Sequence, residues 1–177
     1  MTITALERDE HVDAATFGSV FRDYPAGVAI VTADPGDGPV ALVASSLSSL
    51  SAAPPYIVFS VSDATTAAPA VARADTVLVQ VFGAGRIELV KQLAVSGSDR
   101  FSDESRWTRL PSGEPLFHGT RSWLRGRVEQ RVRAGTATLN VVRVLELGRP
   151  GADDDHRPLV YHDRAWHQLG AHSRVDG

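Results

Sequence analysis

The sequence predicts a mainly β protein, an antiparallel β-barrel with peripheral α-helices. Two observations favour this fold class. Short runs rich in β-branched and aromatic residues recur along the chain, and turns rather than helical segments separate most of them. The apolar fraction of 43% and the charged fraction of 22% are those of an ordinary globular domain. We therefore expect residues 1–177 to form a single domain, with 1–10 and 171–177 as flexible tails.

The amino-terminal part predicts a helix, a β-hairpin and a third strand. Apolar side chains recur at spacings of three and four between His11 and Tyr24, which indicates an amphipathic helix that Pro25 ends. The cluster at 34–38, Asp-Pro-Gly-Asp-Gly, is typical of a turn, because glycine supplies positive φ and proline presets φ. The strands expected on either side of this turn and after it span 27–33, 40–44 and 56–61.

The carboxy-terminal part predicts two more helices and a series of hairpins. Small residues between Ala64 and Ala74 predict a short helix that starts at a threonine cap. After Trp123, apolar residues alternate with charged ones, as in a half-buried antiparallel strand. In all we expect seven or eight strands and three helices. This part contributes strands at 76–82, 123–132 and 136–147, a helix at 84–95, and a closing hairpin of 159–161 and 165–167 that turns at Asp163-Arg164.

Charge and composition exclude several classes of protein. With 18 Lys+Arg against 21 Asp+Glu, the formal net charge is -3, so no basic surface for nucleic acid is expected. The apolar runs are too short to cross a bilayer. The chain has no cysteine, which excludes disulfides and thiolate catalysis, and its histidines lack the spacing of a metal site. The amino terminus does not read as a secretion signal, and we expect a cytoplasmic protein that binds no metal.

The serine-dense stretch from Ser45 to Ser51 is the candidate site. Consecutive hydroxyl groups are costly to bury without partners, so a ligand or solvent should hydrogen-bond to them. Short hydroxyl side chains and neighbouring amides make a cradle for a phosphate or for the polar edge of a ring system. For a serine-rich composition taken alone, a solvated loop is the more common explanation. No residue of this stretch, or of any other, is identified as catalytic.

The order of motifs resembles the flavin reductase-like family of FMN-binding split barrels, the reductase components of two-component flavin-dependent monooxygenases. The most specific segment is Ala-Ser-Ser-Leu-Ser-Ser-Leu-Ser at 44–51, which Pro54-Pro55 follows. It is similar to the Ala-Ser-Ser-Phe-x-Ser-Val-Ser-x-x-Pro-Pro stretch of that family. Weaker matches are Phe-x-x-x-x-x-Gly-Val at 21–28, Asp-Arg-Phe at 99–101, Gly-Glu-Pro-Leu at 113–116 and Pro-Leu-Val-Tyr at 158–161. The resemblance implies a split β-barrel.

The resemblance also implies a function and a site. It implies an NAD(P)H-dependent flavin reductase, a homodimer, that uses NADH or NADPH to supply reduced FMN or FAD to a partner monooxygenase. Replacing Ser46 by leucine is then expected to abolish flavin binding and leave the fold intact. The cofactor-binding residues that it implies are Ala44, Ser45, Ser46, Leu47, Ser51, Ser60, Ser62, Thr65, Thr66, Phe82, Arg100 and Phe101.

The chain departs from the family pattern in two places. The turn at 63–69 lacks the usual Arg or Lys of a phosphate site, so the positive charge is expected from Arg86, Lys91 or Arg100. Ala137 stands where relatives carry the histidine of a Gly-Asp-His motif linked to the nicotinamide. The alternative function is therefore a flavin-binding split barrel with altered chemistry, either a flavin-dependent oxidase or isomerase or a flavin carrier without turnover.

Overall fold

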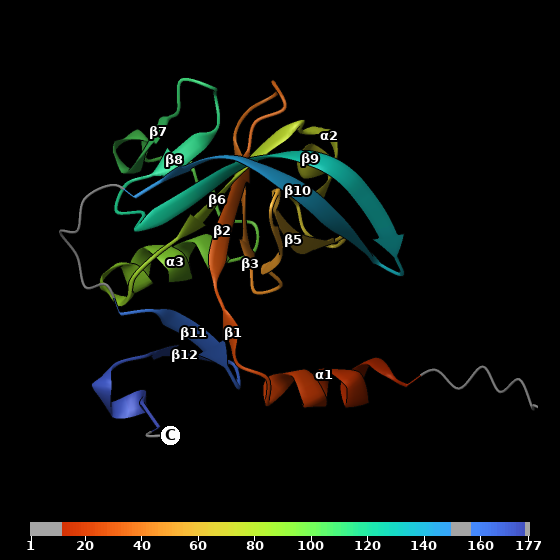
Figure 1. Ribbon diagram of the computed structural model, residues 1–177, viewed down its shortest axis with the longest axis vertical. Helices are drawn as coiled ribbons and strands as arrows, with labels where there is room; N and C mark the ends of the chain where they lie inside the picture. Colours follow the sequence, from red (N-terminus) through yellow and green to blue (C-terminus); the bar gives the residue numbers. More distant parts are fainter. Residues whose placement is uncertain (1–11, 150–156, 176–177) are drawn as a thin grey trace, which may run out of the picture.

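A seven-stranded antiparallel sheet forms the body of the protein (Figure 1). The computed structural model describes residues 12–149 and 157–175. In this sheet the strand order is β3-β2-β6-β9-β10-β5-β4, and neighbouring strands pair antiparallel. The strands span Ala29–Ala33 (β2), Val40–Ala44 (β3), Ser48–Ala52 (β4), Pro55–Ser62 (β5), Thr76–Val81 (β6), Ser122–Ala134 (β9) and Ala137–Gly148 (β10).

Smaller elements surround this sheet. Beside it lie a three-stranded sheet, β1-β11-β12, and a short hairpin, β7-β8. Their bounds are Ala26–Gly27 (β1), Leu159–His162 (β11), Ala165–Gln168 (β12), Trp107–Arg109 (β7) and Pro115–Phe117 (β8). The helices are Ala14–Arg22 (α1), Ala68–Arg73 (α2) and Ile87–Ala94 (α3), with 3-10 turns at Ala84–Arg86 (η1), Glu104–Arg106 (η2) and Ala171–Ser173 (η3). This mainly β architecture confirms the predicted fold class.

The sheet curls back on itself at the serine-dense stretch. Its two edge strands, β3 and β4, follow each other in the chain, and residues 45–47 join them. Within this link, the Ser46 Oγ accepts a hydrogen bond from the Ser60 N–H of β5 at 2.9 Å and donates to the Ser60 carbonyl at 3.3 Å. The link therefore fastens one edge of the barrel to β5, two strands away along the chain.

Buried polar side chains attach the β7-β8 segment to the barrel. The Gln80 amide nitrogen on β6 donates to the Pro115 carbonyl at 3.1 Å, and its oxygen accepts from the Phe117 N–H at 2.8 Å. Glu114, 3% exposed, pairs with Arg125 of β9 at 2.8 Å. Burial raises the pKa of Glu114, but hydrogen bonds from Ser112, Thr76 and Arg125 outweigh it and hold the pKa below its ordinary value.

The structure corrects three local predictions. The helix expected at 64–74 begins later, at Ala68, and its N-cap Ala67 makes no side-chain cap bond, so the threonine cap is wrong. Ser48–Ala52 is a strand, although all five residues are exposed and show no alternation. The expected seven or eight strands become twelve in the described part of the chain, because β1, β4, β7 and β8 are short and carry no periodic pattern.

Helix α1 extends away from the barrel, next to β1 and the β11-β12 hairpin (Figure 1). The Asp13 carboxylate caps it by accepting from the Ala15 and Thr16 N–H groups at 3.0 Å. None of its residues is buried, and Phe17 and Phe21, whose rings lie 4.8 Å apart, are both more than half exposed. No helix in the described residues is long and apolar enough to span a membrane.

The structure describes only part of the two predicted tails. Residues 1–10 lie outside the described residues, as do 176 and 177. Within the second predicted tail, Ala171–Ser173 form the turn η3, where the Ser173 hydroxyl accepts from the Gly170 N–H at 2.8 Å.

Candidate functional site

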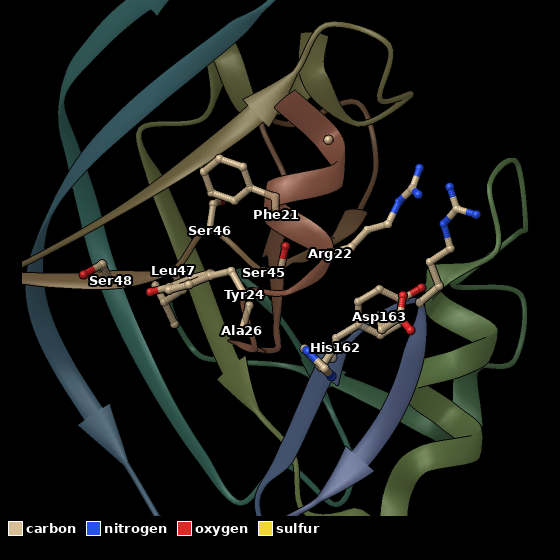
Figure 2. Close-up of a pocket in the computed structure, with 13 residues that line it drawn as sticks. Phe21, Arg22, Tyr24, Ala26, Ser45, Ser46, Leu47, Ser48, His162 and Asp163 are labelled. Carbon is tan, nitrogen blue, oxygen red and sulfur yellow. The ribbon is translucent and has the colours of Figure 1, made fainter. Parts of the chain in front are cut away.

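A groove of about 470 Å³ opens where three segments distant in sequence meet (Figure 2). These segments are the end of α1, the turn between β11 and β12, and the serine-dense stretch after β3. Its volume is that of small-molecule sites, which occupy about 300–1,000 Å³. The groove is lined by Gly18, Phe21, Arg22, Tyr24, Ala26, Ser45, Ser46, Leu47, Ser48, Tyr161, His162, Asp163 and Arg164.

The groove has an apolar part and a charged part. Figure 2 shows Phe21, Ser46 and Leu47 toward one side and Arg22 and Asp163 toward the other. Aromatic and aliphatic side chains offer surface against which a planar ring can pack, whereas guanidinium groups bind phosphate and carboxylate. The arrangement therefore suits a ligand that combines a ring system with an anionic group.

The hydroxyl groups of the serine-dense stretch differ in their availability. The Ser46 hydroxyl is engaged with the backbone of Ser60, and the Ser48 hydroxyl donates to the Ser49 carbonyl at 3.3 Å. The Ser45 hydroxyl has no hydrogen-bond partner among the described residues and is exposed in the groove. Among the serines that line the groove, Ser45 is thus the one whose side chain is free to bind a ligand.

A second part of the predicted site lies on the outer face of β5 and β10. Ser60 and Ser62 alternate along β5 with the buried Phe59 and Val61, so they point away from the core. In the register of β10, Ala137 lies opposite Ser62. The position without the family's histidine is therefore beside a predicted cofactor-binding residue.

The predicted phosphate turn stands apart from the groove. Thr65 and Thr66 lie in the turn before α2, where the Thr65 N–H donates to the Ser62 carbonyl at 3.0 Å. Thr66 lines a separate pocket of about 260 Å³ together with Arg100 and Phe101. The nearby Asp63 forms an ion pair with Arg133 at 2.6 Å, so that guanidinium is already neutralised.

The three cations expected to neutralise a phosphate are not assembled in the groove. Lys91 pairs with Glu88 on the same helix at 2.8 Å. Arg100 donates to the carbonyls of Leu93 and Val95 at the end of α3, and burial lowers its pKa. Arg86 makes interactions of its own and does not line the groove. None of the three lines this groove, and the expectation that one of them neutralises a phosphate stays a prediction.

The other predicted residues are dispersed. Ala44 is buried in β3, and Ser51 is exposed on β4, where it pairs with Tyr56. Phe82 is 3% exposed in the core, and Phe101 stacks on Phe117 with the ring centroids 5.3 Å apart. Of the predicted set, the groove itself brings together Ser45, Ser46 and Leu47. The cofactor contacts of the rest stay predictions.

Sequence reasoning missed most of the other wall of the groove. Arg22, His162, Asp163 and Arg164 belong to no motif, and Asp163-Arg164 was predicted only as a turn. In the structure both turn residues have positive φ, 45° and 60°, a conformation that glycine and asparagine usually supply in such hairpins. The available signal for this wall was the turn itself, because a two-residue hairpin turn without glycine places two side chains in an unusual left-handed conformation. No cluster of three metal-binding side chains occurs in the described part of the chain.

The fold is an antiparallel barrel, and its groove offers both apolar surface and positive charge. Together they indicate a protein that binds a small molecule. The chain belongs to the flavin reductase like family, whose model matches residues 21–170. It is 35% identical over 156 residues to an NADH:FMN oxidoreductase of Rhodococcus qingshengii, covering 88% of this chain and 81% of that protein.

Solved structures agree with this assignment. The flavin reductase domain protein of Arthrobacter sp. FB24 superimposes with a TM-score of 0.84 at 30% identity, covering 93% of this chain and 99% of that one. The flavin reductase component of a bacterial two-component tryptophan halogenase gives a TM-score of 0.78 at 26% identity, covering 89% and 98%. The predicted family and split-barrel fold are confirmed, and with them the class, an oxidoreductase of the flavin reductase family.

Proposed function

We propose that the protein is an NAD(P)H-dependent flavin reductase that supplies reduced FMN or FAD to a separate monooxygenase. The groove beside Ser45–Ser48 carries this proposal, because it joins a free hydroxyl, apolar surface and guanidinium groups at the segment that most resembles the family. In the reaction NADH + H⁺ + FMN → NAD⁺ + FMNH₂, a hydride and a proton pass to the flavin. The flavin supplies the redox chemistry, and the protein supplies binding and orientation.

The residues present fit a flavin. Phe21, Tyr24 and Leu47 offer apolar surface for a tricyclic ring, and the Ser45 hydroxyl is free to hydrogen-bond to its polar edge. Among the described residues that line the groove, Asp163 is the only one with a carboxylate, and two arginines line the same space, so these charges do not repel a phosphate-bearing ligand. These residues would hold and orient the flavin and need not transfer a proton themselves.

A steady-state assay tests the proposal. Purified protein is mixed with NADH or NADPH and with FMN, FAD or no flavin, and absorbance at 340 nm is followed. Turnover that depends on added flavin is the expected result, and comparison of the four pairs identifies the preferred flavin and nicotinamide. Absence of flavin-dependent oxidation in a folded sample would contradict the reductase assignment.

A second candidate function follows from Ala137. In the register of β5 and β10, the neighbours of Ala137 on the same face are Leu139, Ser60 and Ser62. None of them supplies the imidazole that Ala137 lacks. A flavin-binding oxidase, isomerase or carrier that no longer uses nicotinamide efficiently would have this property. Retention of flavin together with negligible NAD(P)H oxidation in the same assay favours this candidate.

We further propose a cytoplasmic homodimer. The exposed Phe17 and Phe21 on α1, with Tyr24 just after its end, offer an apolar surface for a second copy. The lack of cysteine is compatible with a reducing compartment. Size-exclusion chromatography with light scattering is expected to give twice the chain mass of 18.9 kDa. A mass equal to that of one chain would contradict the dimer.

A further inference from the structure

Two arginines of the groove have no partner among the residues that the structure describes. Arg22 and Arg164 both line the groove, and neither makes a side-chain hydrogen bond or an ion pair with any described residue. Three arginines elsewhere on the protein are paired. Arg73 contacts Asp37, Arg109 contacts Asp34, and Arg133 contacts Asp63. The two unpaired guanidinium groups therefore retain their full capacity to bind an anion.

The fold holds these two residues in one place. Arg22 is the last residue of α1, and its carbonyl accepts a hydrogen bond from the Asp163 N–H at 3.1 Å. Arg164 follows directly in the β11-β12 turn, at a φ of 60°. That left-handed backbone conformation is unfavourable for a residue that carries a Cβ. The contact between α1 and the turn thus brings both arginines to the same groove.

The charges of the groove favour an anion. Its fixed charges are the two guanidinium groups and the single carboxylate of Asp163, so the lining is net positive in a chain whose formal net charge is -3. The free Ser45 hydroxyl and the rings of Phe21 and Tyr24 line the same space. A planar ring joined to a phosphate, as in a nucleotide, matches both parts of the groove.

We propose that Arg22 and Arg164 bind the phosphate of the nucleotide that occupies this groove. This inference rests on the proposed function, which supplies two ligands with such a group: the phosphate ester of FMN and the pyrophosphate of NADH. In this groove the two arginines supply positive charge of the kind that the sequence led us to expect from Arg86, Lys91 or Arg100. They act by binding and orienting the ligand.

The experiment compares Arg22→Gln, Arg164→Gln and the double variant with the wild type. Arg127→Gln is the matched control, because Arg127 is exposed on β9, lies outside the groove lining and makes no ion pair with any described residue. Dissociation constants for FMN and for riboflavin, which lacks the phosphate, are measured by flavin fluorescence. KM values for NADH and for FMN are measured at 340 nm, and circular dichroism verifies folding.

If the arginines bind the FMN phosphate, each substitution removes a charge-assisted hydrogen bond. It then weakens FMN binding at least about tenfold, which corresponds to about 1.4 kcal/mol, and leaves riboflavin binding unchanged. If they bind the NADH pyrophosphate, the KM for NADH rises about tenfold and both flavin affinities stay constant. Variants that match Arg127→Gln in every constant would overturn the inference. A wild type that binds FMN more tightly than riboflavin but does not oxidise NADH would refute the proposed function alone, since the binding comparison needs no turnover.

Discussion

Two neighbouring serines, Ser45 and Ser46, allow ligand binding to be separated from closure of the barrel. The Ser46 hydroxyl accepts from the Ser60 N–H at 2.9 Å and donates to the Ser60 carbonyl at 3.3 Å. A net intramolecular hydrogen bond contributes about 1 kcal/mol, and 1 kcal/mol shifts the Tm of a domain of this size by about 2–4 °C. We therefore predict that Ser46→Ala lowers the Tm by about that amount.

Ser45→Leu is predicted to weaken flavin binding and to leave the stability of the fold nearly unchanged. The Ser45 hydroxyl has no partner among the described residues, and exposed substitutions of this kind change stability by no more than about 0.5 kcal/mol. The leucine side chain, however, enters the groove and removes the free hydroxyl. Steric overlap and the lost hydrogen bond together are expected to weaken flavin binding at least about tenfold, or about 1.4 kcal/mol.

Thermal unfolding by circular dichroism and a flavin fluorescence titration, run on both variants, measure the two effects. A Ser45→Leu protein that binds FMN like the wild type would refute the placement of the flavin in this groove. An unchanged Tm for Ser46→Ala would refute the role of Ser46 in closing the barrel. The motif alone predicted that Ser46→Leu abolishes flavin binding with the fold intact, whereas the structure predicts that this change also reduces stability.

Three further predictions concern the core, the pH dependence and the surface. Gln80→Leu leaves the buried Phe117 N–H without its acceptor and should lower the free energy of unfolding by about 1–3 kcal/mol, visible as a lower midpoint in urea; an equal midpoint would contradict it. Glu114 has a folded pKa below the ordinary value of 4.5, so its contribution to stability is complete above that pH and is lost as the pH falls through the folded pKa. Glu114→Gln should therefore reduce the loss of Tm that the wild type shows below pH 4.5. Parallel curves of Tm against pH for the two proteins would exclude this contribution of Glu114. Phe21→Asp places a charge on the exposed face of α1 and should shift the mass in light scattering toward one chain, whereas an intact dimer would show that this face is not the interface.

The hairpins were predictable because local chemistry determines them. In the turn between β2 and β3, the Asp34 carboxylate accepts from the Gly36 and Gly38 N–H groups, and both glycines have positive φ, 112° and 118°. The residues that make this turn are adjacent in the sequence, so composition alone identifies it. The same holds for the position of the turn at Asp163-Arg164.

The edge strand β4 and the boundaries of the groove were not predictable in this way. Ser48–Ala52 has no apolar alternation because all five residues are exposed, and only pairing with β5 makes it a strand. Arg22 and Asp163 meet through a backbone hydrogen bond between segments at opposite ends of the chain. Such contacts depend on the completed barrel and leave no periodic signal in the sequence.

The source of positive charge shows most clearly why a motif is insufficient to define a site. From the sequence, Arg86, Lys91 and Arg100 are equal candidates for binding a phosphate. In the structure, what distinguishes them is whether a partner already uses the charge. Lys91 faces Glu88 one helical turn away, and Arg100 is bound to carbonyls at the end of α3. Arg22 and Arg164 belong to no recognised motif, yet they are unpaired and share a groove with the serines. Because an occupied guanidinium must first lose its partner to bind a ligand, the unpaired arginines are the ones that the geometry favours.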